Sequence, residues 1–93
     1  MGKYTLNLSA RAIKDLKVIY RSGDKLSIKR IEQIFEELAI SPKEGIGKPE
    51  MLKHNYSGFW SRRINPKDRL IYKIEEEIIT IFVIAAKGHY DDK

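Results

Sequence analysis

The segment FWSRRINPKDRLIYKIEEEIITIFVIAA, residues 59–86, decides the fold class of this chain. Apolar and polar side chains alternate over Phe59–Ile64 and again over Arg69–Ile74, which predicts two strands that each bury one face. Asn65–Asp68 predicts the turn between them, and Glu75–Glu77 predicts a second, solvent-exposed turn. Ile78–Ala86 is apolar on both faces and therefore predicts a central strand that is covered on both sides.

The first part of the chain predicts a strand followed by a pair of helices. Side chains alternate over residues 4–8, and Ser9 is a natural N-cap for the helix that follows. Apolar residues spaced three and four apart continue to Gly23, which ends this helix, and Asp24 can cap a second helix that ends before Ser41–Pro42. This order predicts an α+β fold: strand, two-helix hairpin, then antiparallel strands. The helices should pack on one face of the sheet and leave the other for function.

Length and composition limit the kind of protein this can be. Ninety-three residues predict a single domain over 1–93, with residues 91–93 fraying and an open face rather than a deep cavity. The net charge of +5 and pI of about 9.5 favour a polyanionic partner such as nucleic acid, although a basic but ordinary surface has the same composition. The chain has no cysteine, no bilayer-length apolar run and no signal-peptide pattern, so we expect a cytoplasmic protein without disulfides or a membrane partner.

The candidate functional residues gather between residues 44 and 74 and recur near residue 89. Glu50 is surrounded by cations, and His89 lies next to Tyr90. A carboxylate base, a histidine acid and phosphate-binding guanidinium groups are sufficient to cleave RNA without a metal or cofactor. The two histidines also lack the spacing of a metal site. The cations of the stretch are Lys48, Lys53, Arg62, Arg63, Lys67, Arg69 and Lys73.

In this chemistry Glu50 removes the proton of the 2′-hydroxyl, the oxygen attacks phosphorus, and His89 protonates the departing 5′-oxygen. The products are a 2′,3′-cyclic phosphate and a 5′-hydroxyl. Arg63 and Arg69 can act together on the phosphate if the strands pair residue 63 with residue 69, whereas a one-residue slip would separate them. Each residue also has a structural interpretation: a surface glutamate, a histidine with no role, and arginines on a solvated strand.

Aromatic side chains between the cations can either stack on bases or pack in the core. We assign Phe59 and Trp60 to packing, leave Tyr72 open, and take Tyr90 as the best stacking candidate. His54 can stack on RNA or cap a turn, and we assign it a structural role.

Several motifs carry a resemblance to a known family: Gly47–Glu50, Leu52–Asn55, Ser57–Ile64, Arg69–Tyr72 and His89–Tyr90. In this order they resemble the YoeB/Txe toxins of bacterial toxin–antitoxin modules, within the RelE superfamily. The likeness is close over residues 44–74 and at 89–90. Over residues 1–40 it is limited to the strand–helix–helix pattern.

The resemblance implies the toxin of a toxin–antitoxin system, a ribosome-dependent mRNA endoribonuclease (mRNA interferase) that cleaves in the ribosomal A site and inhibits translation. By position, Glu50 matches the family's general base, His89 its general acid and Arg69 the arginine that stabilises the transition state. Further residues are expected to bind RNA or its phosphates: Lys48, Lys53, Arg63 and Tyr90.

The resemblance also implies partners. These are a YefM-like antitoxin whose acidic disordered segment folds over the toxin, the ribosome with its mRNA, in some relatives a second toxin copy, and operator DNA reached only through the antitoxin complex. Two alternatives stay open: a ParE-like inhibitor of DNA gyrase on the same scaffold, and an RNA-binding module without catalysis. Asp91–Lys93 extends beyond the histidine–tyrosine pair at which relatives typically stop, and its role stays open.

Overall fold

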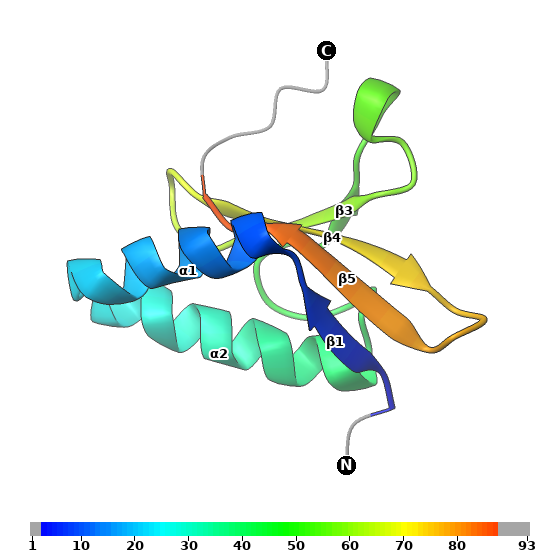
Figure 1. Ribbon diagram of the computed structural model, residues 1–93, viewed down its shortest axis with the longest axis horizontal. Helices are drawn as coiled ribbons and strands as arrows, with labels where there is room; N and C mark the ends of the chain where they lie inside the picture. The colour runs from blue at the N-terminus through cyan, green and yellow to red at the C-terminus, as the bar shows by residue number, and fades with distance from the viewer. Residues whose placement is uncertain (1–2, 88–93) are drawn as a thin grey trace.

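The chain folds into one mixed sheet with both helices on the same face (Figure 1). The computed structural model describes residues 3–87. The sheet has five strands in the order β1-β5-β4-β3-β2. β1 (Thr5–Leu8) pairs in parallel with β5 (Thr80–Ala85), and the other neighbours are antiparallel. The α+β fold expected from the sequence is confirmed.

Both helices begin and end at the residues that the sequence predicts. α1 (Ala10–Ser22) begins after Ser9, whose Oγ accepts the backbone N–H of Ala12, and it ends at Gly23 with φ of 76°. Glycine reaches this left-handed conformation without steric cost. α2 (Lys25–Ile40) begins after Asp24, whose carboxylate accepts the backbone N–H of Ser27. These local signals therefore fix the helical hairpin.

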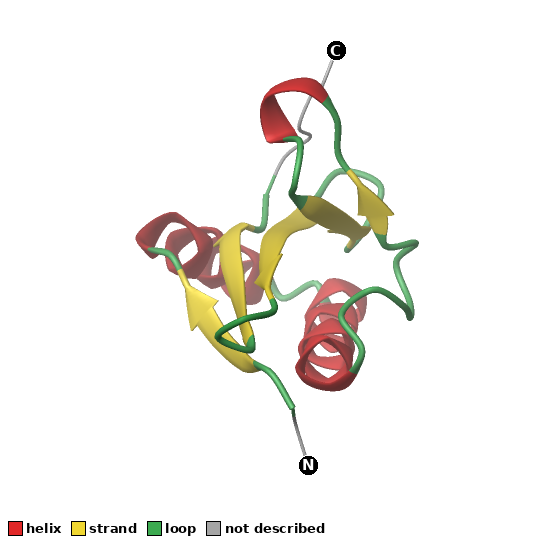
Figure 2. Cartoon of the chain, turned by 90° about the vertical axis from the view of Figure 1, so that its right-hand side faces the viewer, coloured by secondary structure: helices red, strands yellow, loops and turns green. Residues whose placement is uncertain are grey.

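The remaining strands extend the sheet from β5 toward the edge opposite β1 (Figure 2). β2 (Glu50–Met51) is a short edge strand, and a 3₁₀ turn over His54–Tyr56 links it to β3 (Trp60–Arg63). β4 (Arg69–Glu75) follows the 65–68 turn and pairs with both β3 and β5. In the part of the chain that the structure describes, no helix is long and apolar enough to cross a bilayer.

The main core lies between the helices and the sheet. Ile34 and Leu38 of α2 are fully buried against Tyr72 of β4 and Val83 of β5, with further apolar residues around them. A smaller cluster of Leu52, Ile71 and Ala85 is buried on the opposite side, with Phe59 packed against it. Trp60 packs against the main core. The expectation that Phe59 and Trp60 pack is thus confirmed.

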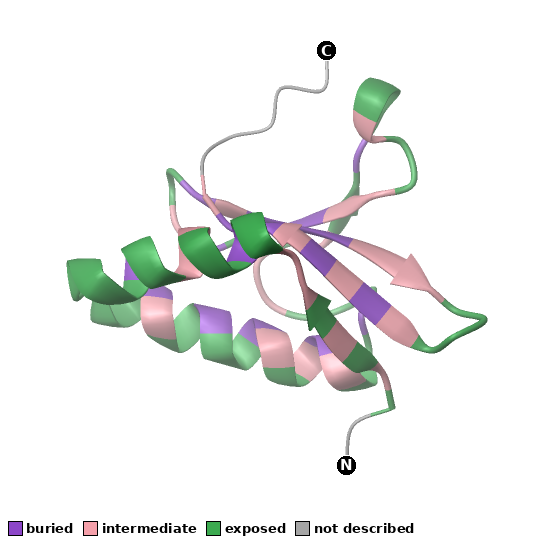
Figure 3. Ribbon diagram, in the orientation of Figure 1, coloured by how far each residue is buried: buried purple, intermediate pink, exposed green. Residues whose placement is uncertain are grey.

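The last strand differs from the prediction at its start and in its coverage. β5 begins at Thr80, because Ile78 and Ile79 belong to the turn, where Ile79 has φ of 48° and both side chains are exposed. The Thr80 hydroxyl donates to the carbonyl of Ile78 and closes this turn. Along β5 buried and half-buried residues alternate (Figure 3). Ile81 and Val83 are fully buried in the main core beneath the helices, whereas Phe82 and Ile84 on the other face are covered only in part.

Candidate functional site

The pairing of β3 with β4 places Arg63 directly opposite Arg69, as the cooperative arrangement requires. On the other edge of β3, Glu50 of β2 lies opposite Ser61. Directly paired residues in an antiparallel sheet project to the same face, and residues two apart along a strand share that face. Glu50, Ser61, Arg63 and Arg69 therefore all project from the face that the helices leave uncovered.

Glu50 and Arg69 meet in this structure. Arg69 Nη1 lies 3.3 Å from Glu50 Oε1, and the side chains are 24% and 61% exposed respectively. An ion pair this open contributes about 0–1 kcal/mol to stability. An incoming anion can therefore take the place of Glu50 beside Arg69 at little cost. A hollow of about 210 Å³ surrounds the pair and is lined by Gly47, Lys48, Glu50, Ser61, Arg63 and Arg69.

The loop before β2 is fixed tightly against β3. The backbone N–H of Arg63 donates to the carbonyl of Gly47 at 2.7 Å. Gly47 has φ of 81°, and a Cβ there would lie 2.7 Å from the Arg63 carbonyl oxygen. Only glycine fits both the conformation and the close approach. Lys48, also at positive φ, follows directly and leads into Glu50.

Arg62 does not belong to the phosphate-binding cations, which corrects the sequence interpretation. Its side chain is fully buried. The guanidinium donates to Glu37 Oε1 at 2.7 Å and to the backbone carbonyls of Ser41, Pro42 and Glu44. Strand alternation explains the difference, because residue 62 faces the helices when residue 63 faces away. The guanidinium thus fixes the loop between α2 and β2 on the helix-facing side of β3, opposite the face from which Glu50 and Arg63 project.

Tyr72 is likewise a core residue rather than a base-stacking one. It is fully buried, and its hydroxyl donates to the Pro42 carbonyl at 2.9 Å and accepts from Arg62 Nε at 3.3 Å. Burial raises the pKa of the Tyr72 phenol, and the neighbouring Arg62 partly offsets this shift. Tyr72 therefore stays neutral and supports the same loop as Arg62.

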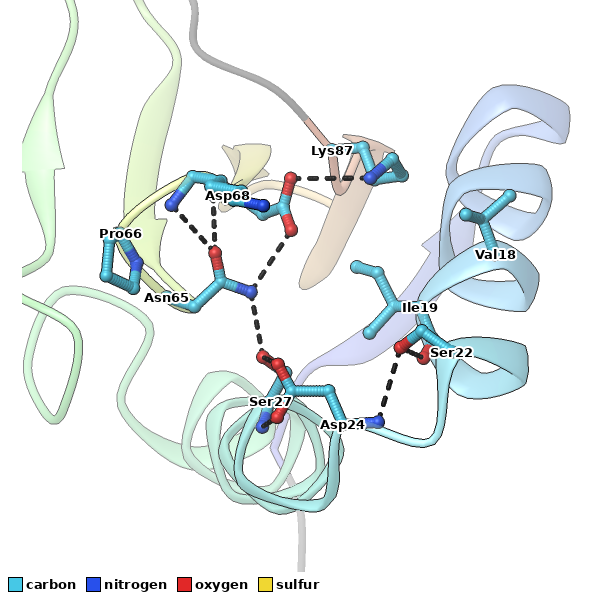
Figure 4. Close-up of a pocket in the computed structure, with 10 residues that line it drawn as sticks. Val18, Ile19, Ser22, Asp24, Ser27, Asn65, Pro66, Asp68 and Lys87 are labelled. Carbon is cyan, nitrogen blue, oxygen red and sulfur yellow. Dashed lines mark hydrogen bonds and ion pairs between the residues drawn. The ribbon is translucent and has the colours of Figure 1, made fainter.

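A polar network fixes the turn between Arg63 and Arg69 (Figure 4). Asn65 Oδ1 accepts the backbone N–H groups of Lys67 and Asp68, both at 2.8 Å, and Asn65 Nδ2 donates to Ser27 Oγ at 2.7 Å. The buried carboxylate of Asp68 accepts from Asn65 Nδ2 and lies 3.6 Å from Lys87 Nζ. The network connects α2, the turn and the end of β5. Asn65 and Asp68 lie in the turn that the sequence predicts, whereas their contacts with Ser27 and Lys87 were not predicted.

The other predicted residues fall in two groups. Lys48 lines the hollow, whereas Lys53 is exposed beyond the end of β2 and does not line it. His54 has φ of 57° in the 3₁₀ turn, where its carbonyl accepts the N–H of Ser57, so the structural role assigned to it is consistent with its backbone. His89, Tyr90 and the 91–93 extension lie outside the described residues, as does the expected fraying.

Among residues 3–87, no group of three or more His, Cys, Asp or Glu side chains could hold a metal ion. The hollow around Glu50 and Arg69 contains one carboxylate and three cationic side chains, a composition that suits an anion.

Residues 8–90 match the family described as "YoeB-like toxin of bacterial type II toxin-antitoxin system". The chain belongs to this family. The YoeB toxin of Synechocystis is 44% identical over 71 residues, covering 76% of this chain and 80% of that protein. The YoeB toxin of Escherichia coli K12 is 41% identical over 71 residues, covering 76% of this chain and 82% of that protein.

Solved structures agree with this family. A YoeB dimer from Staphylococcus aureus superposes with a TM-score of 0.79 at 35% identity, covering 95% of this chain and 99% of that chain. A heterotetrameric YoeB–YefM toxin–antitoxin complex from the same organism gives a TM-score of 0.77 at 35% identity, covering 94% and 98%. This YoeB-like chain is therefore the toxin of a toxin–antitoxin system, with the RelE/YoeB fold.

Proposed function

We propose that this YoeB-like toxin is a ribosome-dependent mRNA endoribonuclease. The observation that carries the proposal is the contact of Glu50 with Arg69 in an open hollow that also contains Arg63 and Lys48. A carboxylate in this position can accept a proton. The cations can hold the phosphate whose neighbouring 2′-hydroxyl supplies that proton.

In the proposed reaction Glu50 removes the 2′-hydroxyl proton while the 2′-oxygen forms a bond to phosphorus. The bond from phosphorus to the 5′-oxygen breaks, and His89 gives this oxygen its proton. A 2′,3′-cyclic phosphate and a 5′-hydroxyl result, and no step requires a metal ion. Arg69 has five N–H donors, so it can keep its contact with Glu50 while it binds an oxygen of the phosphorane.

We propose dependence on the ribosome because the site is shallow. A hollow of about 210 Å³ is below the usual range of small-ligand pockets, roughly 300–1,000 Å³, and cannot enclose and orient a nucleotide alone. An external surface that holds the mRNA would supply the missing orientation. We further propose a YefM-like antitoxin and a second toxin copy as partners, because relatives have been solved in both assemblies. Operator DNA would be contacted through the antitoxin complex.

The test is cleavage of a defined mRNA on purified ribosomes, with the product ends identified chemically. We expect a cyclic phosphate upstream and a 5′-hydroxyl downstream of the cut. Glu50→Gln and His89→Gln should each lower the cleavage rate by about 100-fold or more, since general acid–base catalysis contributes typically 10²–10⁴. Lys17→Gln removes a charge from the exposed outer surface of α1 and should leave the rate unchanged.

Two other outcomes would point to the rival functions. If the toxin binds mRNA in a salt-sensitive manner without producing new ends, it is an RNA-binding module. If translation continues while DNA gyrase is inhibited, the toxin acts as ParE-like relatives do.

A further inference from the structure

A second hollow adjoins the first on the other side of Arg63. It lies between α2 and the end of β3 with its turn, and its volume is about 590 Å³. Its walls are Leu26, Lys29, Arg30 and Gln33 from α2 facing Arg63 and Pro66. Arg63 lines both this groove and the catalytic hollow, so the two hollows border each other at this residue. We call it the α2 groove.

The α2 groove carries uncompensated positive charge. Within residues 3–87 the side chains of Lys29, Arg30 and Arg63 take part in no ion pair. Asp24 is the acidic residue in the lining, and its carboxylate already accepts from the hydroxyl and the backbone N–H of Ser27. Among the described residues, the groove therefore presents three cationic side chains without an ion-pair partner against one carboxylate, that of Asp24.

The groove also has the apolar surface that a nucleotide needs. Leu26 is 81% exposed near the start of α2, and Pro66 is exposed on the opposite wall. Apolar side chains next to cations suit a ribose or base whose phosphate binds the cations. The volume is within the range of pockets that hold small ligands.

We propose that the α2 groove binds the substrate RNA strand where it continues beyond the cleaved linkage. This inference rests on the proposed function, because Arg63 borders both hollows and the cations of the groove suit the same polyanion, the substrate strand. Lys29 and Arg30 hold successive phosphates, and Leu26 with Pro66 contacts the intervening sugar or base. Binding of this kind is independent of sequence, since phosphates carry no sequence information.

The experiment measures binding of non-cleavable 2′-O-methyl RNA to the free toxin by fluorescence anisotropy. A trinucleotide centred on the catalytic hollow is too short to reach the groove as well, whereas an oligonucleotide of about nine residues can occupy both. Wild-type toxin should bind the longer RNA more tightly. In Lys29→Gln/Arg30→Gln this gain should fall on the order of tenfold at 0.1 M salt, with the salt slope of log K reduced by about 1.4. Trinucleotide binding should be unchanged.

The matched control is Lys14→Gln/Lys17→Gln, which removes the same charge from the exposed face of α1. Three outcomes overturn the proposal: equal losses in the two double variants, no gain from the longer RNA in wild type, or unchanged RNA affinity with weaker binding to ribosomes or antitoxin. The last would assign the groove to another partner. Cleavage on ribosomes tests the proposed function separately. If the wild-type toxin does not cleave mRNA but still binds the longer RNA more tightly through the groove, the proposed function is refuted and the binding groove is not.

Discussion

Removing the charge of Glu37 should destabilise the toxin far more than its position on α2 suggests. Arg62 is fully buried and Glu37 Oε1 is its charged partner at 2.7 Å, while the Glu37 side chain is 27% exposed. Removing one member of a buried ion pair costs about 3–5 kcal/mol, and the partial exposure of Glu37 reduces this. Glu37→Gln keeps an acceptor for Arg62 and for the N–H of Ile46. We therefore expect a loss of about 2–3 kcal/mol.

This loss is large for a domain of 93 residues, whose total stability is roughly 5–14 kcal/mol. Urea unfolding followed by tryptophan fluorescence measures it, and the midpoint should fall by about 1–2 M. Glu36→Gln is the matched control, because it makes the same change one residue earlier on the exposed face of α2. Its effect should stay within about 0.5 kcal/mol. Equal midpoints for the two variants would refute the role assigned to the buried pair.

The same variant should affect the site, because Arg62 and Glu37 anchor the loop that leads to Glu50. At a temperature where Glu37→Gln remains folded, we expect a lower kcat for ribosomal cleavage with little change in KM. A purely global loss of stability would lower the amount of active enzyme without altering its response to pH. If the variant has the wild-type kcat per folded molecule and a pH–rate profile of the same shape, the Arg62–Glu37 pair contributes only to stability.

Other predictions can be checked with the same assays. Gly47→Ala should cost more than 1 kcal/mol and slow cleavage, because its Cβ would lie 2.7 Å from a β3 carbonyl, whereas Gly58→Ala, with φ of 93° but nothing within 4 Å, should cost about 1 kcal/mol and leave the rate intact. Asn65→Ala should lower stability by about 1–3 kcal/mol in urea unfolding through the turn it holds, and equal stability would contradict the network. The hydrogen bond from the Ser27 hydroxyl lowers the pKa of Asp24 below its ordinary value of 3.8. The ionised Asp24 therefore stabilises the fold fully above pH 3.8, and this contribution is lost as the pH falls through the pKa of Asp24 in the folded protein. The difference in Tm between wild type and Asp24→Ala should accordingly narrow in acid, and a constant difference would refute the cap's charge dependence.

The sequence predicts well those features that depend on neighbours along the chain. Ser9, Gly23 and Asp24 fix the helix ends through contacts within a few residues, and alternation predicts β3 and β4, although their register stayed open until the structure showed it. That pairing was the condition for Arg63 and Arg69 to act together. The contact of Glu50 with Arg69 also depends on β2, a two-residue edge strand that the sequence does not predict.

Features that depend on distant segments were missed. The acceptors of Arg62 come from the end of α2 and the loop after it, so its charge alone suggested a surface role. Strand parity contained the correcting signal, because outward Arg63 requires inward Arg62. Ile78 was assigned to a strand from its apolar character, although three preceding glutamates favour extending the turn.

The place of β5 in the sheet has a consequence for when the toxin becomes competent. This strand comes last among the described elements, yet it lies between β1 and β4 and supplies Ile81 and Val83 to the core. While the ribosome still encloses those residues, β1 has no partner in the sheet and the helices have no complete surface to cover. The nascent chain therefore reaches its native state only after nearly all of it has been synthesised and has emerged. On the proposed function, folded toxin therefore cannot act on the ribosome that is still making β5.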